Sequence, residues 1–590
     1  MASEPGASSG VVFATGHVST NIISADDTQQ ELDIDIAQAP HLHDTLCHVN
    51  RLPTELLGHI FSYLKGLRGS NGDLISVTHV CKQWRGAAIN DPQLWTSFAP
   101  HGSPELKAYL ARSRNMSLSL FFTKSPSPIS KSAKLLKQAS HRIHTLHIAI
   151  PDPRAIEMLL NSIRPAALLL EELYVRHVLS FEDKQRTRVG IPDVGNQSFV
   201  FCNWFHFPSL RSLVLHNVPP FFLPTAPLEH LELEMSRYYA RDLTLDQFPS
   251  VEELLLVLER CPRLRTLKLS ALGVWCYEGA QRDPVALADL SSISLSIRPP
   301  EATASLLSYL ALPDRTTLRI AENLMAPEVF ADFLRDLTPL SPSLRWTQGL
   351  RYLALHWGRN PCQLQAYRDS DPDDLGEPPA LDMRLGSFHF GPQSSREFMT
   401  SWLPAFNTSN IETLVLYHNS SENISNPHAV SLVDWCSILR GLPNLSTLSA
   451  VSFDDATAEC LIQALGTVGA AREVFCPRLE TLELMDLDLD DGRMWQGLFD
   501  IATARTAGGQ FPGTFKKMAF VGCRELQQLK GSEWEKKFNE QGVELYIEED
   551  EDEEDEEYEE DEEYDEDKDK YEDEDDEEGE GDEGTDDSDI

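Results

Sequence analysis

The chain has 590 residues and a formal net charge of −43 at neutral pH. This length can bury a large core and exceeds that of one ordinary domain. The ten cysteines form no C-x-x-C pair and no Cys/His spacing suited to zinc, which fits a reducing compartment. No run approaches the roughly 18 apolar residues of a membrane span, and no signal peptide opens the sequence. We therefore expect an intracellular soluble protein, in the cytoplasm or the nucleus, with no membrane contact.

The acidity is concentrated near the C-terminus. Residues 548–590 contain 32 acidic residues and two lysines, whereas the other 547 residues carry a net charge of only −13. Carboxylates closer than a Debye length of about 8 Å repel one another, so we expect a disordered acidic tail. This tail could simply aid solubility, or it could attract basic proteins such as histones. Neither part has a strongly basic face, so no direct nucleic-acid partner is expected.

Residues 1–47 form the first segment of the chain. They are rich in Ser, Gly, Ala, Asp and Gln, and this composition predicts disorder. His41, His43 and His48 have no partnering cysteine or carboxylate pattern, so they are interpreted as loop histidines. We expect no metal and no cofactor.

Residues 48–98 form a small helical unit. Leu52-Pro53 is a helix start, and the apolar residues from Leu56 to Leu64 recur at three- and four-residue spacing on one helical face. A glycine-rich loop at 66–72 precedes Asp73, an N-cap for a second apolar run that ends at Asp91-Pro92. This predicts two or three short helices with more apolar side chains than so small a unit can bury. Surplus apolar surface indicates a docking face.

The order and spacing of these pieces resemble the F-box. The resemblance is carried by Leu-Pro-x-Glu-Leu-Leu at 52–57, then Ile60-Phe61, Val80-Cys81-Lys82-x-Trp84-Arg85 and Asp91-Pro92-x-Leu94-Trp95, with a loop at 65–72 longer than the family usually shows. It implies docking on a Skp-type adaptor and, through it, on a cullin. Some of the expected adaptor contacts must instead form the internal core, Trp84 foremost among them. These expected contacts are Leu52, Pro53, Leu56, Ile60, Phe61, Leu64, Val80, Cys81, Trp84, Leu94 and Trp95. The alternative is a helical subdomain that merely packs on its neighbour.

Residues 99–139 are expected to connect this unit to the rest of the chain. The apolar spacing predicts a helix over 105–112, and alternation predicts a strand over 116–122. A Ser/Pro-rich break follows at 124–132.

Residues 140–547 contain a repeated L-x-x-L-x-L pattern. Two nearly identical nonapeptides, at 261–269 and 476–484, begin with Cys-Pro-Arg-Leu, and a further copy lies at 207–215. Weaker copies centre on Leu146, Leu173, Leu231, Ile293, Leu318, Leu353, Phe388, Leu414, Leu448, Met518 and Leu545. Amphipathic helices are predicted between them at 251–260, 301–312, 327–337, 395–406, 430–442 and 456–465.

This alternation predicts an α/β solenoid with short parallel strands on the concave side and helices on the convex side. It resembles the leucine-rich repeat family, although the asparagine expected after L-x-L is mostly absent, with Asn217 a partial match. The alternative is a Leu-rich α/β domain without regular repeats. A charged, Pro-rich insertion at 358–381 is long for a loop, so it is either a functional excursion or disordered. With the helical unit in front, the fold class overall is α+β.

No nucleotide, metalloprotease or hydrolase motif occurs in the chain, so no catalytic activity is expected. The resemblances to the F-box and the leucine-rich repeat family together imply the substrate-recognition subunit of an SCF-type ubiquitin ligase, whose repeats hold a target protein that the sequence does not name. The alternatives are an adaptor-bound scaffold outside ubiquitylation and a binder of histones or other basic proteins through the acidic tail. Residues expected to face the target on the concave side are His216, Ser270, His356, Tyr417 and Met485.

Overall fold

A computed structural model of the chain describes three stretches, residues 48–64, residues 72–178 and most of residues 207–548. The expected disorder at 1–47, the helix expected at 327–337, most of the helix expected at 395–406 and the repeat copy at Phe388 lie outside the described residues. So does the acidic tail expected at 548–590, apart from Glu548 at the end of a described strand. Gaps within the second and third stretches fall at 165, 219–226, 237–248, 275–281, 323–348, 359–361, 369–377, 386–398, 401, 403–405, 407, 420–429, 468–473, 488–491, 507–514 and 524–531.

The N-terminal unit is helical, as its apolar spacing predicts. It consists of the short 3-10 helix η1 (His48–Arg51), the helices α2 (Thr54–Ser62), α3 (Gly72–Val77) and α4 (Lys82–Asn90), and the 3-10 helix η3 (Pro92–Trp95). The second apolar run divides into α3 and α4, because Cys81 adopts an extended backbone and its Sγ accepts a hydrogen bond from Trp84 N at 3.5 Å. That bond caps the new helix at its start.

A 17-stranded sheet forms most of the described chain. Its first nine strands pair in parallel, each with the next one along the chain. They are β1 (Ser97–Phe98), β2 (Leu118–Phe122), β3 (Ile143–Ile150), β4 (Glu172–His177), β5 (Ser212–His216), β6 (His230–Glu234), β7 (Thr266–Gly273), β9 (Ser292–Arg298) and β11 (Thr317–Glu322). The sheet therefore starts inside the helical unit and runs through the segment expected only to connect.

The sheet continues with eight further strands, of which all but β13 run in the common direction. Their spatial order is β14 (Leu381–Leu385), β13 (Gln363–Tyr367), β12 (Tyr352–Gly358), β15 (Thr413–Asn419), β16 (Thr447–Val451), β17 (Thr481–Met485), β18 (Lys517–Val521) and β19 (Glu544–Glu548). A separate two-stranded sheet pairs β8 (Val285–Ala286) with β10 (Leu310–Ala311).

The strand order at β12–β14 corrects the expectation for the insertion at 358–381. Its described part forms β13, which runs antiparallel to both β12 and β14. Consequently β11 pairs with β14 rather than with the next strand of the chain, β12. Strands joined by a connection as short as 359–362 can only pair antiparallel, because a parallel crossover needs a dozen or more residues.

Helices lie between the strands in the chain. They are α5 (Ser103–Arg112), α6 (Ile129–Ala139), α7 (Pro153–Ile163), α10 (Val251–Glu259), α11 (Pro300–Ser308), α14 (Leu432–Arg440), α15 (Asp455–Gly466), α16 (Gly492–Thr506) and α17 (Glu533–Glu540), with the 3-10 turns η4 (Ser140–Arg142) and η8 (Thr408–Asn410). The helices expected at 251–260, 430–442 and 456–465 are confirmed, and the one expected at 301–312 ends at Ser308 because Leu310–Ala311 pairs with β8. The prediction missed α6, α7, α16 and α17.

One register relates the leucines of neighbouring strands. Leu146 of β3 lies opposite Leu173, which lies opposite Leu213, and the column continues through Leu231 and Leu267. These side chains are buried, and so are those two residues further along each strand, whereas the residues between them are only half-buried or exposed. The alternation predicted from L-x-L is therefore what separates the core side of the sheet from its open side.

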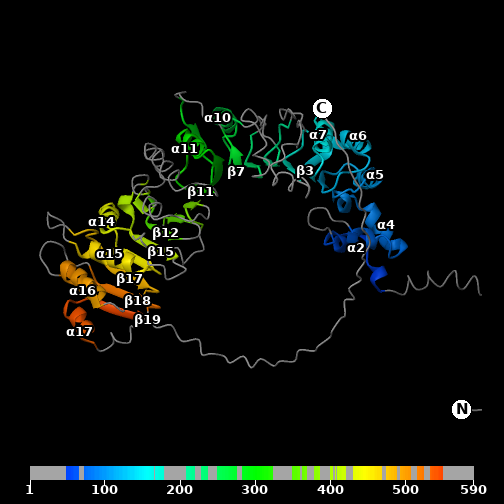
Figure 1. The fold of residues 1–590 in the computed structure, drawn as a ribbon. Coiled ribbons are helices and arrows are strands. Elements are labelled where there is room, and N and C mark those ends of the chain that lie inside the picture. The colour runs from blue at the N-terminus through cyan, green and yellow to red at the C-terminus, as the bar shows by residue number, and fades with distance from the viewer. Residues whose placement is uncertain are drawn as a thin grey trace, which may run out of the picture.

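The sheet curves into an open arc, with helices on its outer side and strands on its inner side (Figure 1). The helical N-terminal unit lies at one end of the arc, and α17 and β19 lie at the other. The buried leucines pack on the helix side of the sheet, and because side chains alternate along a strand, the half-buried residues between them face the inner side.

Asn217 only partly provides the asparagine ladder that the resemblance would imply. Its backbone has a positive φ of 56°, and its side-chain amide donates to His177 O at 3.1 Å while its side-chain oxygen accepts from Ser236 N at 2.6 Å. The same left-handed backbone recurs directly after β16, β17 and β18, at Ser452, Asp486 and Gly522, and within β7 at Ala271. The turn is thus repeated even where the asparagine is missing.

Candidate functional sites

The helical unit at 48–98 has a buried core, which continues into α5, where Tyr109 packs on Trp95 and Phe98. Leu57, Phe61, Leu94 and Trp95 are each no more than 1% exposed. The indole Nε1 of Trp95 donates to Ala88 O at 2.7 Å, so its only polar group is satisfied inside. Because a buried aromatic side chain with a satisfied donor is fixed in place, Trp95 anchors η3 to α4.

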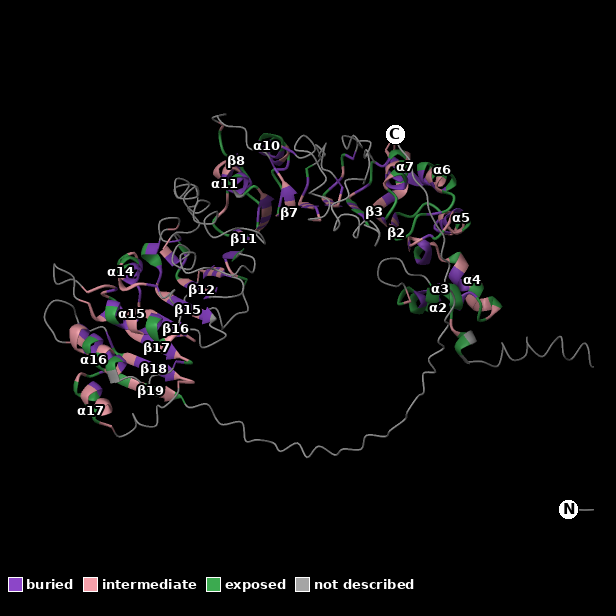
Figure 2. Cartoon of the chain, in the orientation of Figure 1, coloured by how far each residue is buried: buried purple, intermediate pink, exposed green. Residues whose placement is uncertain are grey.

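Several large apolar side chains of this unit stay exposed. Leu56 and Ile60, one turn apart on α2, are 51% and 46% exposed. Tyr63 just after α2 is 76% exposed, and Val80 before α4 is 60% exposed. Figure 2 marks exposed residues on α2, α3 and α4. An exposed set of this kind on one small unit is typical of a protein-binding surface. We call Leu56, Ile60, Tyr63, Ile75 and Val80 the exposed apolar set.

The residues expected to contact an adaptor divide into three groups. Leu56, Ile60, Val80 and Pro53 are exposed, and Leu52, Leu64, Cys81 and Trp84 are half-buried. Phe61, Leu94 and Trp95 are buried, so they belong to the part of this set that was expected to form the internal core. Apolar spacing alone places Ile60 and Phe61 in the same helix but does not say which of the two the core covers.

Trp84 is intermediate between core and surface. Its ring packs on Phe61 with the ring centroids 5.3 Å apart. Its buried indole Nε1 has no hydrogen-bond partner among the described residues. The expectation that Trp84 belongs to the internal core therefore fits its packing, although its side chain is not fully covered.

The structure adds Tyr63 and Ile75 to the residues that the sequence singled out. Tyr63 follows Leu56 and Ile60 by seven and three positions, so helical spacing could have assigned it to their face. Ile75 is 38% exposed on α3 beside buried Leu74. No spacing signal separates such neighbours, because α3 has only six residues.

All five residues expected to face a target lie at one position of the strand repeat, directly after the second core residue. In one part of the sheet His216 is opposite Glu234, which is opposite Ser270. In the other part His356 is opposite Tyr417, and Val451 links Tyr417 to Met485. We call these residues, with their strand neighbours at the same position, the inner row. The five are all half-buried on the open side of the sheet.

The inner row differs in chemistry between its two parts. Around His216 it contains charged and hydroxyl side chains, whereas His356, Tyr417, Val451 and Met485 form an aromatic and apolar series. The His356 and Tyr417 rings stack with centroids 4.1 Å apart and planes 4° apart. Burial lowers the pKa of His356, because the partly buried ring has less water around it to stabilise its charged form.

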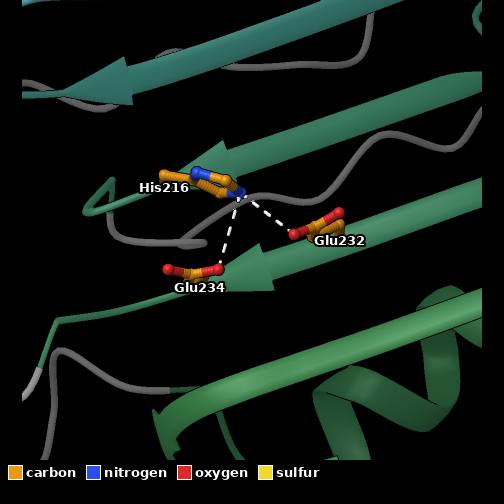
Figure 3. Close-up of side chains that lie close together, drawn as sticks. All are labelled: His216, Glu232 and Glu234. Carbon is orange, nitrogen blue, oxygen red and sulfur yellow. Dashed lines mark hydrogen bonds and ion pairs between the residues drawn. The ribbon is translucent and has the colours of Figure 1, made fainter. Parts of the chain in front are cut away.

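His216 lies at the centre of a polar network on β4–β7. Its Nδ1 is 3.2 Å from the Tyr174 hydroxyl, and its Nε2 is 3.1 Å from Glu232 Oε1 and 3.8 Å from Glu234 Oε2 (Figure 3). Lys268 Nζ lies 2.7 Å from the same Glu232 oxygen and 3.4 Å from the same Glu234 oxygen. Sequence spacing gave no signal for this cluster, because its members come from four strands.

The pKa values of this network follow from those contacts. Partial burial opposes ionisation of Glu232, but hydrogen bonds from Lys268 and His216 outweigh it and lower the pKa. Partial burial likewise disfavours the charged form of Lys268, but its contacts with Glu232 and Glu234 outweigh it and raise the pKa. Both groups are therefore charged at neutral pH.

A ladder of rings leads up to this network from β2. His147 stacks on Tyr174 with centroids 3.9 Å apart, and Phe121 lies 5.7 Å from His147 on the other side. Tyr174 in turn meets His216 edge-on at 5.1 Å. The open side of the sheet near the helical unit thus carries aromatic groups, followed by the charged cluster.

Comparison with known families agrees with this geometry at the N-terminal unit. Residues 49–101 match the F-box-like family, a stretch of 53 residues in a chain of 590. The chain therefore contains an F-box-like domain, and domains of this kind are generally non-catalytic and bind Skp-type adaptors. No curated protein matches the chain. None of the described helices combines the length and apolarity needed to cross a membrane.

Proposed function

We propose that this chain is the substrate-recognition subunit of an SCF-type ubiquitin ligase. The F-box-like domain docks on a Skp-type adaptor, which links it to a cullin, and the curved sheet holds a target protein. The chain performs no chemistry itself. It raises the local concentration of the target's lysines near a ubiquitin-charged partner, so the rate gain comes from proximity.

The observation that carries the proposal is the exposed apolar set within a domain of the F-box-like family. A unit whose core is already well packed has no structural need to leave Leu56, Ile60, Tyr63 and Val80 in water. Docking would remove this apolar surface from solvent, and that burial is the usual source of affinity at the centre of an interface.

We further propose that residues 140–547 form a leucine-rich-repeat-like solenoid whose inner row contacts the target. Support comes from the shared leucine register, the recurring left-handed turn and the helices on one side of the arc. His356, Tyr417 and Met485 would supply aromatic and apolar contacts, whereas His216 and Ser270 would supply polar ones. A target matching both would offer an apolar patch beside a polar one.

The proposal is tested by affinity purification of the full-length chain from cells, compared with the Leu52→Ala/Pro53→Ala variant. The variant should lose the adaptor and the cullin while it keeps its folded state and its other partners. Those remaining partners are then tested as substrates in a reconstituted ubiquitylation reaction. Retention of adaptor and cullin by the variant would contradict the docking assignment. Adaptor binding without any ubiquitylated partner would favour a scaffold outside ubiquitylation.

A further inference from the structure

We propose that His216, Glu232 and Glu234 form a binding site for a divalent transition-metal ion, with Zn²⁺ as the fitting species. The site lies on the open side of the sheet and goes beyond the docking function, on which it does not depend. One imidazole and two carboxylates are a donor set that Zn²⁺ accepts.

The three donors converge because of their strand positions. His216 and Glu234 are register partners on β5 and β6, and Glu232 precedes Glu234 by two residues, so all three point to the same side of the sheet (Figure 3). One ligand atom from each lies within 4.8 Å of the others. Metal bonds of about 2.1 Å in a tetrahedron place neighbouring donors about 3.4 Å apart. The separations of 3.1 and 3.8 Å from His216 Nε2 to the two carboxylates lie on either side of that value.

A second observation is that the positively charged Lys268 ammonium group already lies between the two carboxylates. The ammonium group of Lys268 bridges Glu232 Oε1 and Glu234 Oε2, the same two oxygens that face His216 Nε2. Lys268 therefore marks a position where two carboxylates hold positive charge. Its side chain is 42% exposed, so it can turn into solvent when a metal ion takes its place. Lys268 and Glu234 are 42% and 43% exposed, so this ion pair is weak enough for a coordinating ion to displace it.

Tyr174 orients the imidazole for coordination. Its hydroxyl holds His216 Nδ1 at 3.2 Å, which leaves Nε2 directed at the carboxylates. A hydrogen-bonded partner on the second ring nitrogen is the usual arrangement of metal-binding histidines. Glu232 is also supported, since its other oxygen lies 3.7 Å from His230 Nε2. Three protein ligands would leave a coordination position open toward the inner side of the arc, where a donor from a bound protein could complete the shell.

The test is a Zn²⁺ titration of the full-length chain by calorimetry, with excess Mg²⁺ present to occupy the acidic tail. Mg²⁺ suits this purpose because it prefers octahedral oxygen sites and retains its waters. We expect one saturable Zn²⁺ site in the wild-type chain. His216→Ala and Glu232→Gln should each weaken it about tenfold or more, and Tyr174→Phe about tenfold. Lys268→Met should tighten it about fivefold, because the competing ammonium is gone.

His144→Ala is the matched control. His144 Nε2 of β3 lies 3.3 Å from Glu171 Oε2, directly before β4, and the part of the chain that the structure describes places no third metal-binding donor beside this pair. It should leave the Zn²⁺ affinity unchanged, and circular dichroism checks that every variant is folded. Equal Zn²⁺ binding by the wild-type, His216→Ala and His144→Ala proteins would overturn the proposal. So would the absence of a saturable site in both the wild-type and the Lys268→Met proteins. Either failure leaves adaptor docking untouched, because the two are measured separately.

Discussion

Truncation of Leu56 and Ile60 should weaken adaptor binding without unfolding the chain. Full burial of a Leu or Ile side chain contributes about 1.5–3 kcal/mol. Since these two are 51% and 46% exposed, docking can still bury about half of each. The two together would then contribute about 1.5–3 kcal/mol, so Leu56→Ala/Ile60→Ala should raise the Kd about 10- to 150-fold.

The assay is calorimetry of the full-length chain with a purified Skp-type adaptor. The matched control is Leu256→Ala/Val433→Ala, which truncates two apolar residues that are 43% and 73% exposed on α10 and α14. The control should bind like the wild-type chain, and both variants should keep the wild-type Tm within a few degrees. A Kd for Leu56→Ala/Ile60→Ala within threefold of wild type would refute the reasoning. An equal loss in the control would do so as well.

Three further predictions concern stability. Phe61→Ala should lower the free energy of unfolding by about 3–5 kcal/mol, because it opens a cavity in the core of the F-box-like domain. Ile60→Ala, at the neighbouring exposed position, should lower it by less than about 1 kcal/mol. Chemical denaturation of the two variants measures the difference. Arg505→Leu should lower the free energy of unfolding by about 3 kcal/mol or more. The buried guanidinium donates hydrogen bonds to Cys476 O at 2.8 Å and to Phe475 O at 2.7 Å, and the variant would leave both carbonyls without these bonds. Exposed Arg493→Leu on the same helix is its control, and equal Tm values for the two would contradict the assignment. Burial lowers the pKa of His418 and outweighs the opposing effect of Asp454, so the folded state favours the neutral ring. Its contribution to stability is complete above about pH 6.5 and is lost as the pH falls below that value. Tm measured from pH 7 to pH 5 should therefore fall more steeply for the wild-type chain than for His418→Gln, and parallel curves would refute this.

The leucine column and the inner row follow from the sequence to a large degree. A strand has a period of two, so once Leu213 and Leu215 are assigned to the core, Val214 and His216 must face the other side. Parallel strands at a common register then align His216 with Ser270, and His356 with Met485. The sequence could not predict that His147 would stack on Tyr174, with Phe121 tilted against His147. Ring contacts of this kind depend on side-chain rotamers on different strands.

The sequence alone determined the helical unit at 48–98 and the alternation of buried and half-buried residues along the strands, because both depend on local spacing. Only the tertiary structure decided that Phe61 is core while Ile60 is surface, since that depends on which neighbouring elements cover α2. It also decided that β14 and β13 lie between β11 and β12 in the sheet. The same holds for the cluster in which His216 and Lys268 both contact Glu232 and Glu234. These outcomes depend on pairing between strands distant in the chain. A local pattern of leucines restricts such pairing to one face of each strand, but it does not specify which strand lies next to which.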